Sequence, residues 1–218
     1  EVTNNGATAL DITGWKVDDN SNLFSSAIAL TGITSIAPGE SVIFIESSTS
    51  NPAPTVTANF KSLWFGTNPP ASLQVGTYQG SGIGLSTGGD AVNIYDASGA
   101  LQANVVFGPS PITLFKTFNN AIGLNNTTIS LLSAVGVNDA FVAVNDVNEI
   151  GSPGSVGRLF VSEVAPWSSG NSPVAADWFE VTNTKAVAVD ITGWKVDDNS
   201  QSPAGAVLLN GITSINPG

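Results

Sequence analysis

The residues of this chain that could carry chemistry are carboxylates, hydroxyls and amides, because its 218 residues include no His and no Cys. These two absences exclude Ser–His and Cys–His nucleophile pairs, zinc sites of the His/Cys type, disulfides, and haem or iron–sulfur ligation through these residues. Acid–base chemistry by carboxylates and calcium binding remain open, since both use oxygen atoms of Asp, Glu, Asn and Ser.

One serine lies in a motif known from hydrolases. Gly84-Leu85-Ser86-Thr87-Gly88 matches the G-x-S-x-G pattern of a nucleophile elbow, which needs a strand–turn–helix context and a His base. The chain has no His, and no long helical pattern follows the motif. The sequence therefore favours a Gly-rich turn, and Ser86 is not predicted as a nucleophile.

Two acidic stretches could bind calcium. The Asp18–Asn22 loop (Asp-Asp-Asn-Ser-Asn) places oxygen ligands at alternate positions, and Asp197–Gln201 repeats the pattern. The Gly and the distal Glu of an EF-hand are missing at their spacing, and Asp, Asn and Ser are also ordinary turn residues. A solvated turn is favoured, and calcium at Asp18–Asn22 is the alternative. A looser set in a predicted loop (Asp139, Asp146, Glu149) is interpreted in the same way.

Sugar chemistry receives little support. Paired carboxylates can cleave glycosides, but with 17 acidic residues pairs arise by chance, and none is singled out. Trp64, Phe65 and Tyr78 could stack on sugar rings if exposed, although packing in a core or against a helix is favoured for all three. The sequence therefore predicts no catalytic, cofactor-binding or metal-binding residue.

The charge balance restricts the partners. Six basic residues against 17 acidic ones give a net charge of −11, which argues against binding to nucleic acid or adsorption to anionic lipid. Charged residues make up 11% of the chain and apolar residues 42%, so a core is expected and disorder is not. No apolar run is long enough to span a membrane. No secretion signal begins the sequence, so one is expected to be absent or already removed.

An internal repeat dominates the organisation. Residues 1–39 recur without a gap at 180–218, an offset of 179, and 26 of the 39 pairs are identical. The segment Asp11–Ser21 (DITGWKVDDNS) returns unchanged as Asp190–Ser200. Differences cluster at residues 22–26 against 201–205, which is typical of a loop.

Neither copy is complete. The second has a lead-in, residues 158–166 and 177–179, that the first lacks, and the first has a continuation, residues 40–155, that the second lacks. The sequence is interpreted as a window on an array, cut out of phase with its modules; a truncated two-domain protein is the alternative. Residues 1–155 are predicted to be a module lacking its first strands, and 156–218 the start of a second copy.

Short β-strands are the prevailing signal. Runs rich in Val, Ile and Phe are separated by Gly, Pro, Asn, Asp and Ser; they lie at 7–12, 41–46, 91–95, 101–107, 140–144, 159–164 and 178–181. One short helix is expected at 57–65, where Phe60, Leu63 and Trp64 share a face. This pattern predicts an all-β sandwich or barrel. A linker is expected at 151–157 (Gly-Ser-Pro-Gly-Ser-Val-Gly).

Several separated motifs are similar to the lamin tail domain. They include Leu159–Pro166, Asp177–Asn183 (DWFEVTN) and Val189–Val196 (VDITGWKV), and, in the first copy, Ile36–Phe44 and Gly84–Asp96. The resemblance implies an immunoglobulin-like β-sandwich of the bacterial type, found in secreted and cell-surface proteins and not known to be catalytic. Residues 108–155 extend beyond its usual core. Trp15, Trp178 and Trp194 are expected to be core residues, and Gly14 and Gly193 turn residues.

The resulting expectation is a non-enzymatic, extracellular or cell-surface repeat that assembles with copies of itself into a fibre, sheath or surface layer. The chain has few charged residues that would prevent edge-to-edge pairing of its strands with those of a neighbour. An incomplete sandwich could be completed within its own chain or, head to tail, by a neighbour's strands. The alternative is an accessory module of a secreted hydrolase that binds carbohydrate or cell wall, and a weak hydrolase is the third possibility. No cofactor is expected.

Overall fold

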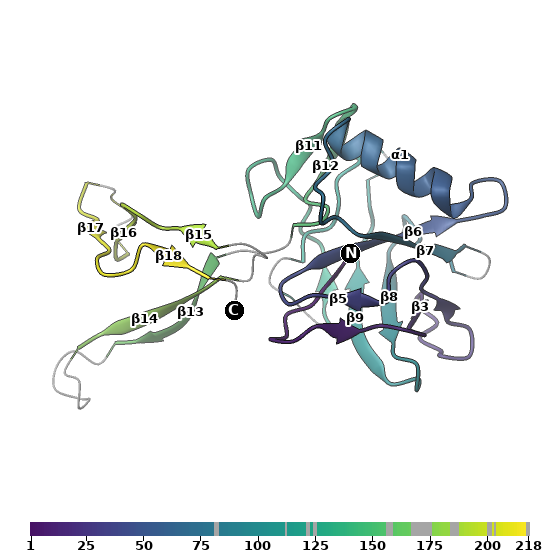
Figure 1. Ribbon diagram of the computed structural model, residues 1–218, viewed down its shortest axis with the longest axis horizontal. Coiled ribbons are helices and arrows are strands. Elements are labelled where there is room, and N and C mark those ends of the chain that lie inside the picture. The colour runs from purple at the N-terminus through teal and green to yellow at the C-terminus, as the bar shows by residue number, and fades with distance from the viewer. Residues whose placement is uncertain are drawn as a thin grey trace. The chain divides into compact units, whose positions relative to one another are not determined.

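The chain forms two compact units, Glu1–Val156 (unit 1) and Gly157–Gly218 (unit 2) (Figure 1). The computed structural model describes residues 1–80, 83–111, 113–120, 123, 126–155, 159–166, 176–183, 188–199, 202 and 204–216. Of the predicted linker, Gly151 ends a strand and Ser152–Ser155 form a turn, while residues 156 and 157 lie outside the described part.

The described residues of unit 1 form two main sheets. The first has the order β1 (Val2–Thr3), β6 (Ser41–Ser47), β7 (Val75–Gln79). The second has the order β10 (Thr128–Ile129), β9 (Leu101–Phe107), β8 (Asp90–Tyr95), β3 (Lys16–Asp18), β4 (Ile28–Ala29). A small pair, β2 (Leu10–Asp11) and β5 (Ser35–Ile36), lies beside them.

The core of unit 1 combines residues of both main sheets. Trp15, next to β3, and Val17 of β3 share one cluster with Val42 of β6 and Ile94 of β8. Apolar residues from opposite sheets thus pack on one another, which is the arrangement of a β-sandwich. Within the described residues the fold is all-β apart from one helix, as the sequence predicted.

The helix, α1 (Ala53–Phe65), joins two parallel strands. β6 and β7 pair in parallel, and such a pair needs a long crossover. α1 starts four residues before the predicted range, because Pro54 is tolerated in the first turn of a helix. Val56 and Trp64 are its buried residues.

Residues 108–155, which the family resemblance left unassigned, extend unit 1. β10 pairs in parallel with β9, and β11 (Phe141–Ala143) pairs with β12 (Asp146–Gly151). The turn after β11 covers the end of α1: the amides of Val144 and Asn145 donate to the carbonyls of Trp64 and Leu63. β12 and β7 were not among the predicted strands, since neither has a strong apolar alternation.

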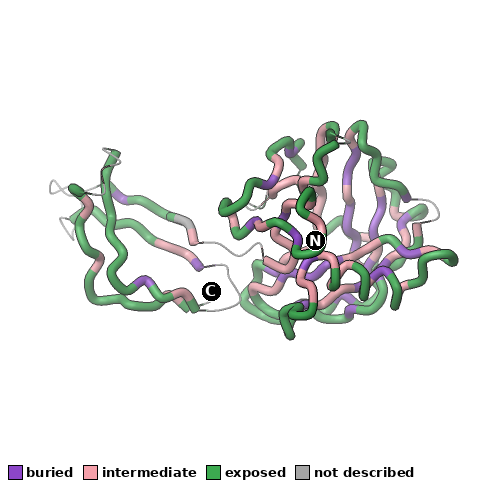
Figure 2. The backbone as a smooth tube through the Cα atoms, turned by 90° about the horizontal axis from the view of Figure 1, so that it is seen from above, coloured by how far each residue is buried: buried purple, intermediate pink, exposed green. Residues whose placement is uncertain are grey.

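The described residues of unit 2 form three strand pairs. β13 (Leu159–Ala165) pairs with β14 (Trp178–Asn183), β15 (Val189–Asp190) with β18 (Ser214–Ile215), and β16 (Lys195–Val196) with β17 (Val207–Leu208). Figure 2 shows that most of its described residues are exposed, whereas buried residues are frequent in unit 1.

Two of the three tryptophans assigned to a core are exposed. Trp15 is buried as predicted, but Trp178 and Trp194 are wrong as core residues. For Trp194 the physical reason is that its counterpart Trp15 packs in a cluster with Val42 of β6 and Ile94 of β8, whereas residues 180–218 repeat only 1–39. Trp178 has no counterpart in unit 1 and begins β14, which pairs with β13 in a two-stranded sheet. The turn residues are confirmed: Gly14 and Gly193 both have φ = 78°, a conformation that favours glycine.

Candidate functional site

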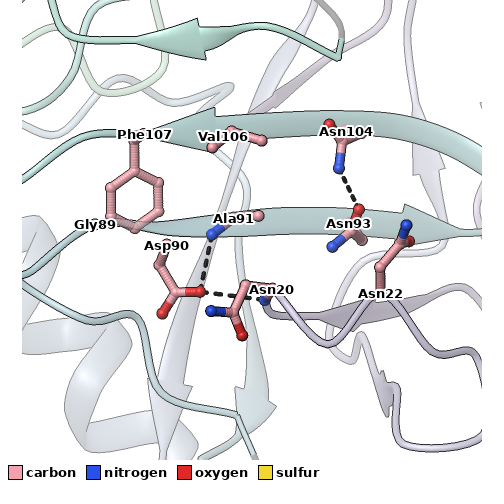
Figure 3. Close-up of a pocket in the computed structure, with 9 residues that line it drawn as sticks. All are labelled: Asn20, Asn22, Gly89, Asp90, Ala91, Asn93, Asn104, Val106 and Phe107. Atoms are coloured by element: carbon pink, nitrogen blue, oxygen red, sulfur yellow. Dashed lines mark hydrogen bonds between the residues drawn. The ribbon is translucent and has the colours of Figure 1, made fainter.

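A polar pocket in unit 1 is the candidate site. It has a volume of about 400 Å³ and lies where β8 and β9 meet the loop after β3 (Figure 3). Side-chain amides are its most frequent feature; the lining residues are Asn20, Asn22, Gly89, Asp90, Ala91, Asn93, Asn104, Val106 and Phe107.

Asp90 fixes one wall of the pocket. Its buried carboxylate accepts hydrogen bonds from three backbone N–H groups: those of Asn20 at 3.1 Å, Ala91 at 2.8 Å and Ser86 at 2.7 Å. Figure 3 draws the bonds from Asn20 and Ala91 as dashed lines that meet at Asp90. The carboxylate thereby ties the loop after β3 to the turn that precedes β8. Its acceptor capacity serves the backbone, so Asp90 is a structural anchor.

Asparagine amides form the opposite wall. Asn93 is fully buried, and its Nδ2 donates to the carbonyl of Asp19 at 2.5 Å. Its Oδ1 accepts from Nδ2 of Asn104 on the neighbouring strand. Tyr95 donates its hydroxyl to Oδ1 of Asn22 at 2.6 Å. The side chains of this wall are neutral, and the hydrogen bonds named here join them to one another, to Tyr95 and to the backbone.

The Asp18–Asn22 loop forms its own hydrogen-bond network. Asp18 is fully buried and accepts from the Ser21 hydroxyl at 2.6 Å, from the Leu23 amide at 2.7 Å and from the Ser26 hydroxyl at 3.2 Å. Desolvation acts to raise the pKa of Asp18, but these hydrogen bonds outweigh it and leave the pKa below its ordinary value. The carboxylate that would lead a calcium loop therefore stabilises a turn.

The other acidic residues named from the sequence lie on β12 and beside it. Among the described residues, no group of three or more His, Cys, Asp or Glu is placed to hold a metal ion. Asp146 and Glu149 were expected in a loop but lie on β12. Desolvation, followed by the charge of Asp146, raises the pKa of Glu149. The Asp139 carboxylate accepts from the Ser155 hydroxyl.

The G-x-S-x-G motif is a turn. The hydroxyl oxygen of Ser86 accepts from the amide of Gly88 at 3.1 Å, and the carbonyl of Ser86 accepts from Gly89, whose φ is 107°. Ser86 thus stabilises the turn before β8, in agreement with the interpretation favoured from the sequence.

The three candidate sugar-stacking aromatics pack against protein. Trp64 is buried and forms an edge contact with Phe141, with ring centroids 5.6 Å apart. Phe65 packs on the same ring at 5.7 Å. Tyr78 is half-buried against the core cluster. This is the packing role that the sequence favoured.

Sequence reasoning missed the pocket residues Asp90, Asn93 and Asn104. A signal was present, because Asn93 interrupts the apolar run Ala91–Tyr95 and a buried amide in a strand requires partners. Nothing in the sequence identified those partners.

Comparison with known proteins identifies one family. The family model of the Lamin Tail Domain matches residues 1–109 and 152–218. No curated protein and no solved structure matches the chain. The match omits 110–151, the segment that contains β10, β11 and β12. Within the described residues, no helix has the length and apolarity to cross a membrane.

Proposed function

Because the chain belongs to the lamin tail domain family, with its immunoglobulin-like fold, we propose that it is a non-enzymatic structural repeat. In this role the module assembles with like modules into a fibre, sheath or surface layer outside the cell. Strand pairing and sandwich packing hold the modules together. The split of the family match over two segments agrees with a tandem arrangement.

The observation that carries the proposal is that the repeated segment folds in the same way twice. β2–β5 and β15–β18 pair in the same register, and so do β3–β4 and β16–β17. Even a side-chain bond recurs: Asn4 Nδ2 donates to the carbonyl of Ile36 at 2.9 Å, and Asn183 donates to that of Ile215 at 2.9 Å. A unit that repeats its local structure is suited to building a regular array.

The chemistry of the described residues supports a role without catalysis. The carboxylates of Asp18 and Asp90 accept hydrogen bonds from their own turns. Charged residues are only 11% of the chain, so a surface rich in neutral hydrogen-bonding groups can approach a like surface with little repulsion. The extracellular location rests on the family resemblance.

Electron microscopy of the native material tests the proposal, together with sedimentation of the purified chain. We expect regular assemblies with an axial repeat. Dispersed monomers in the native material would contradict the structural role.

A second function is favoured by the pocket. Four Asn side chains and the half-buried ring of Phe107 border it, and amides beside an aromatic ring are groups that can hold a neutral sugar. Carbohydrate binding by an accessory module is therefore the alternative. Calorimetric titration with neutral oligosaccharides tests it: Asn104→Ala should abolish any binding, whereas Asn68→Ala, an exposed amide outside the pocket, should not.

A further inference from the structure

Residues 110–151 of unit 1 lie outside the family match and add pairings of their own to the sandwich. Segment 115–117 pairs with β12, since an isolated parallel bridge joins Lys116 to Ile150. The amide of Thr117 donates to the carbonyl of Ile150, and the amide of Ile150 donates to the carbonyl of Phe115. The stretch that follows β9 is therefore attached to the β11–β12 hairpin.

Segment 131–133 pairs with residues 117–119. Phe118 and Leu132 form an antiparallel bridge. The amide of Ser133 donates to the carbonyl of Thr117 at 2.9 Å, and the hydroxyl oxygens of these two residues are hydrogen-bonded at 2.8 Å. Two stretches that are separated in the sequence are thus held together in unit 1.

These two stretches gather exposed apolar side chains, which we call the apolar patch. Each member is between 46% and 61% exposed; the members are Leu114, Phe115, Leu131, Val135 and Val137. Outside 110–151, the described residues of unit 1 expose three large apolar side chains, those of Leu23, Leu85 and Leu101. Single exposed apolar residues are normal, but a group of them marks an interaction surface.

The charges of the chain indicate what this surface contacts. Residues 97–138 contain one charged residue, Lys116, although the chain has a net charge of −11. A basic partner would need acidic groups on the patch, and an acidic partner would need more than one basic residue. A second copy presents the same nearly uncharged surface, so two patches can meet with little of the repulsion that acidic surfaces exert on one another.

We propose that the apolar patch is an interface between two copies of this chain. The patch of one copy faces the same patch of the second copy about a two-fold axis, as in other isologous contacts. The ring of Phe115 and the side chain of Leu131 become buried there, and apolar burial drives the association. The inference rests on the proposed function and deepens it, because it supplies a contact between separate chains that the sandwich strands do not provide.

Sedimentation of the full chain over a range of concentrations tests the inference. We expect the chain to dimerise, and Leu131→Lys should raise the dissociation constant at least about tenfold, because it buries a charge in an apolar contact. The matched control is Leu23→Lys, which makes the same change of charge at a leucine that is also exposed in unit 1 but lies outside the patch. Circular dichroism verifies that both variants fold.

Chemical cross-linking tests the location of the contact. Because the chain has no Cys, one introduced thiol reports on one position. Leu131→Cys treated with a short bismaleimide should give covalent dimers at a yield several-fold above that of Leu23→Cys. Equal yields for the two variants would overturn the inference.

The sedimentation results separate this inference from the proposed function. A chain that stays monomeric overturns the inference and leaves the proposed function in place, since modules of one tandem chain can still form a regular array. Association that survives Leu131→Lys, or that both Lys variants weaken equally, also overturns it. Weakening by Leu131→Lys alone upholds the inference; if the native material then shows no regular assemblies, only the proposed fibre fails.

Discussion

At the residue scale, the buried carboxylate of Asp18 shows how one side chain organises a turn. It accepts three hydrogen bonds from residues 21–26, with little exposure to water. Its counterpart Asp197 also accepts from a loop amide, that of Ser202 at 2.6 Å, but is exposed. The repeat therefore offers an internal control for the effect of burial on a hydrogen-bonded carboxylate.

We expect Asp18→Asn to destabilise unit 1 by about 1–3 kcal/mol, because an amide group replaces a charged acceptor facing three donors. The folded-state pKa of Asp18 lies below its ordinary value, so its contribution is present above the unfolded pKa of about 3.9 and is lost as the pH falls through the folded pKa. Urea unfolding from pH 7 downward should show the difference between the two proteins shrinking in acid. Asp197→Asn should have a much smaller effect; an equal effect would contradict the role of burial.

Calcium gives a second prediction at this scale. Because the Asp18 carboxylate is engaged by Ser21, Leu23 and Ser26, millimolar Ca²⁺ should leave the Tm unchanged, and chelator should have no effect. A rise in Tm that saturates with Ca²⁺ and disappears in Asp18→Asn would instead establish the calcium alternative.

At the element scale, close packing of strands and helix determines the shape of unit 1. β7 approaches its neighbours through Gly76: an added Cβ would lie 2.5 Å from the Thr31 carbonyl oxygen and 2.7 Å from the Phe44 ring. The C-terminal end of helix α1 packs against β11, through the edge contact between Trp64 and Phe141. These contacts fix the parallel pair β6–β7 and the crossover between them.

Gly76→Ala should destabilise unit 1 by at least about 1–3 kcal/mol, since a backbone carbonyl cannot move away as a flexible side chain can. Gly84→Ala is the matched control, because an added Cβ there meets no atom within 4 Å. Denaturant unfolding followed by circular dichroism measures both. Similar midpoints for the two variants would show that β7 lies farther from its neighbours.

Trp64→Ala should cost about 3–5 kcal/mol of unit 1 stability, because it removes a buried ring between α1 and β11. Phe115→Ala, which truncates an exposed aromatic side chain, should change stability by about 0.5 kcal/mol or less. The comparison is made by calorimetric unfolding. A small loss in Trp64→Ala would mean that residues 108–155 do not depend on the helix.

At the scale of the whole molecule, the two copies of the repeated sequence are buried to different extents. Unit 1 buries its copy of the repeat under residues 40–107, and unit 2 leaves its copy exposed. Stability should differ accordingly, since the burial of apolar surface is the dominant favourable contribution to folding.

Two identical substitutions at equivalent positions measure this difference. Trp15→Ala should destabilise unit 1 by about 3–5 kcal/mol, whereas Trp194→Ala in the same chain should change stability by about 0.5 kcal/mol or less. Hydrogen exchange should show faster opening of 188–199 than of 9–20, with peptides that begin before the shared sequence to tell the copies apart. Equal losses of stability in the two variants would show that the Trp194 side chain is buried in solution.

Several elements followed from local sequence. The apolar runs predicted β6, β8 and β9 closely because alternation on a strand needs no knowledge of the partner strand. The helix α1 followed from the spacing of Phe60, Leu63 and Trp64. The pocket did not, because Asp90 and Asn104 contact partners set by chain topology, and topology is not a local property.

The sequence by itself determined the repeat, the absence of His and Cys chemistry, the all-β composition and the family. Each of these depends on residue identity and local order alone. Only the tertiary structure decided that Trp15 is a core residue while Trp194 is exposed, although the ten residues Asp11–Asn20 and Asp190–Asn199 are identical. The physical reason is that burial belongs to a pair of surfaces, and the second surface lies more than 20 residues away in the chain, on β6 and β8.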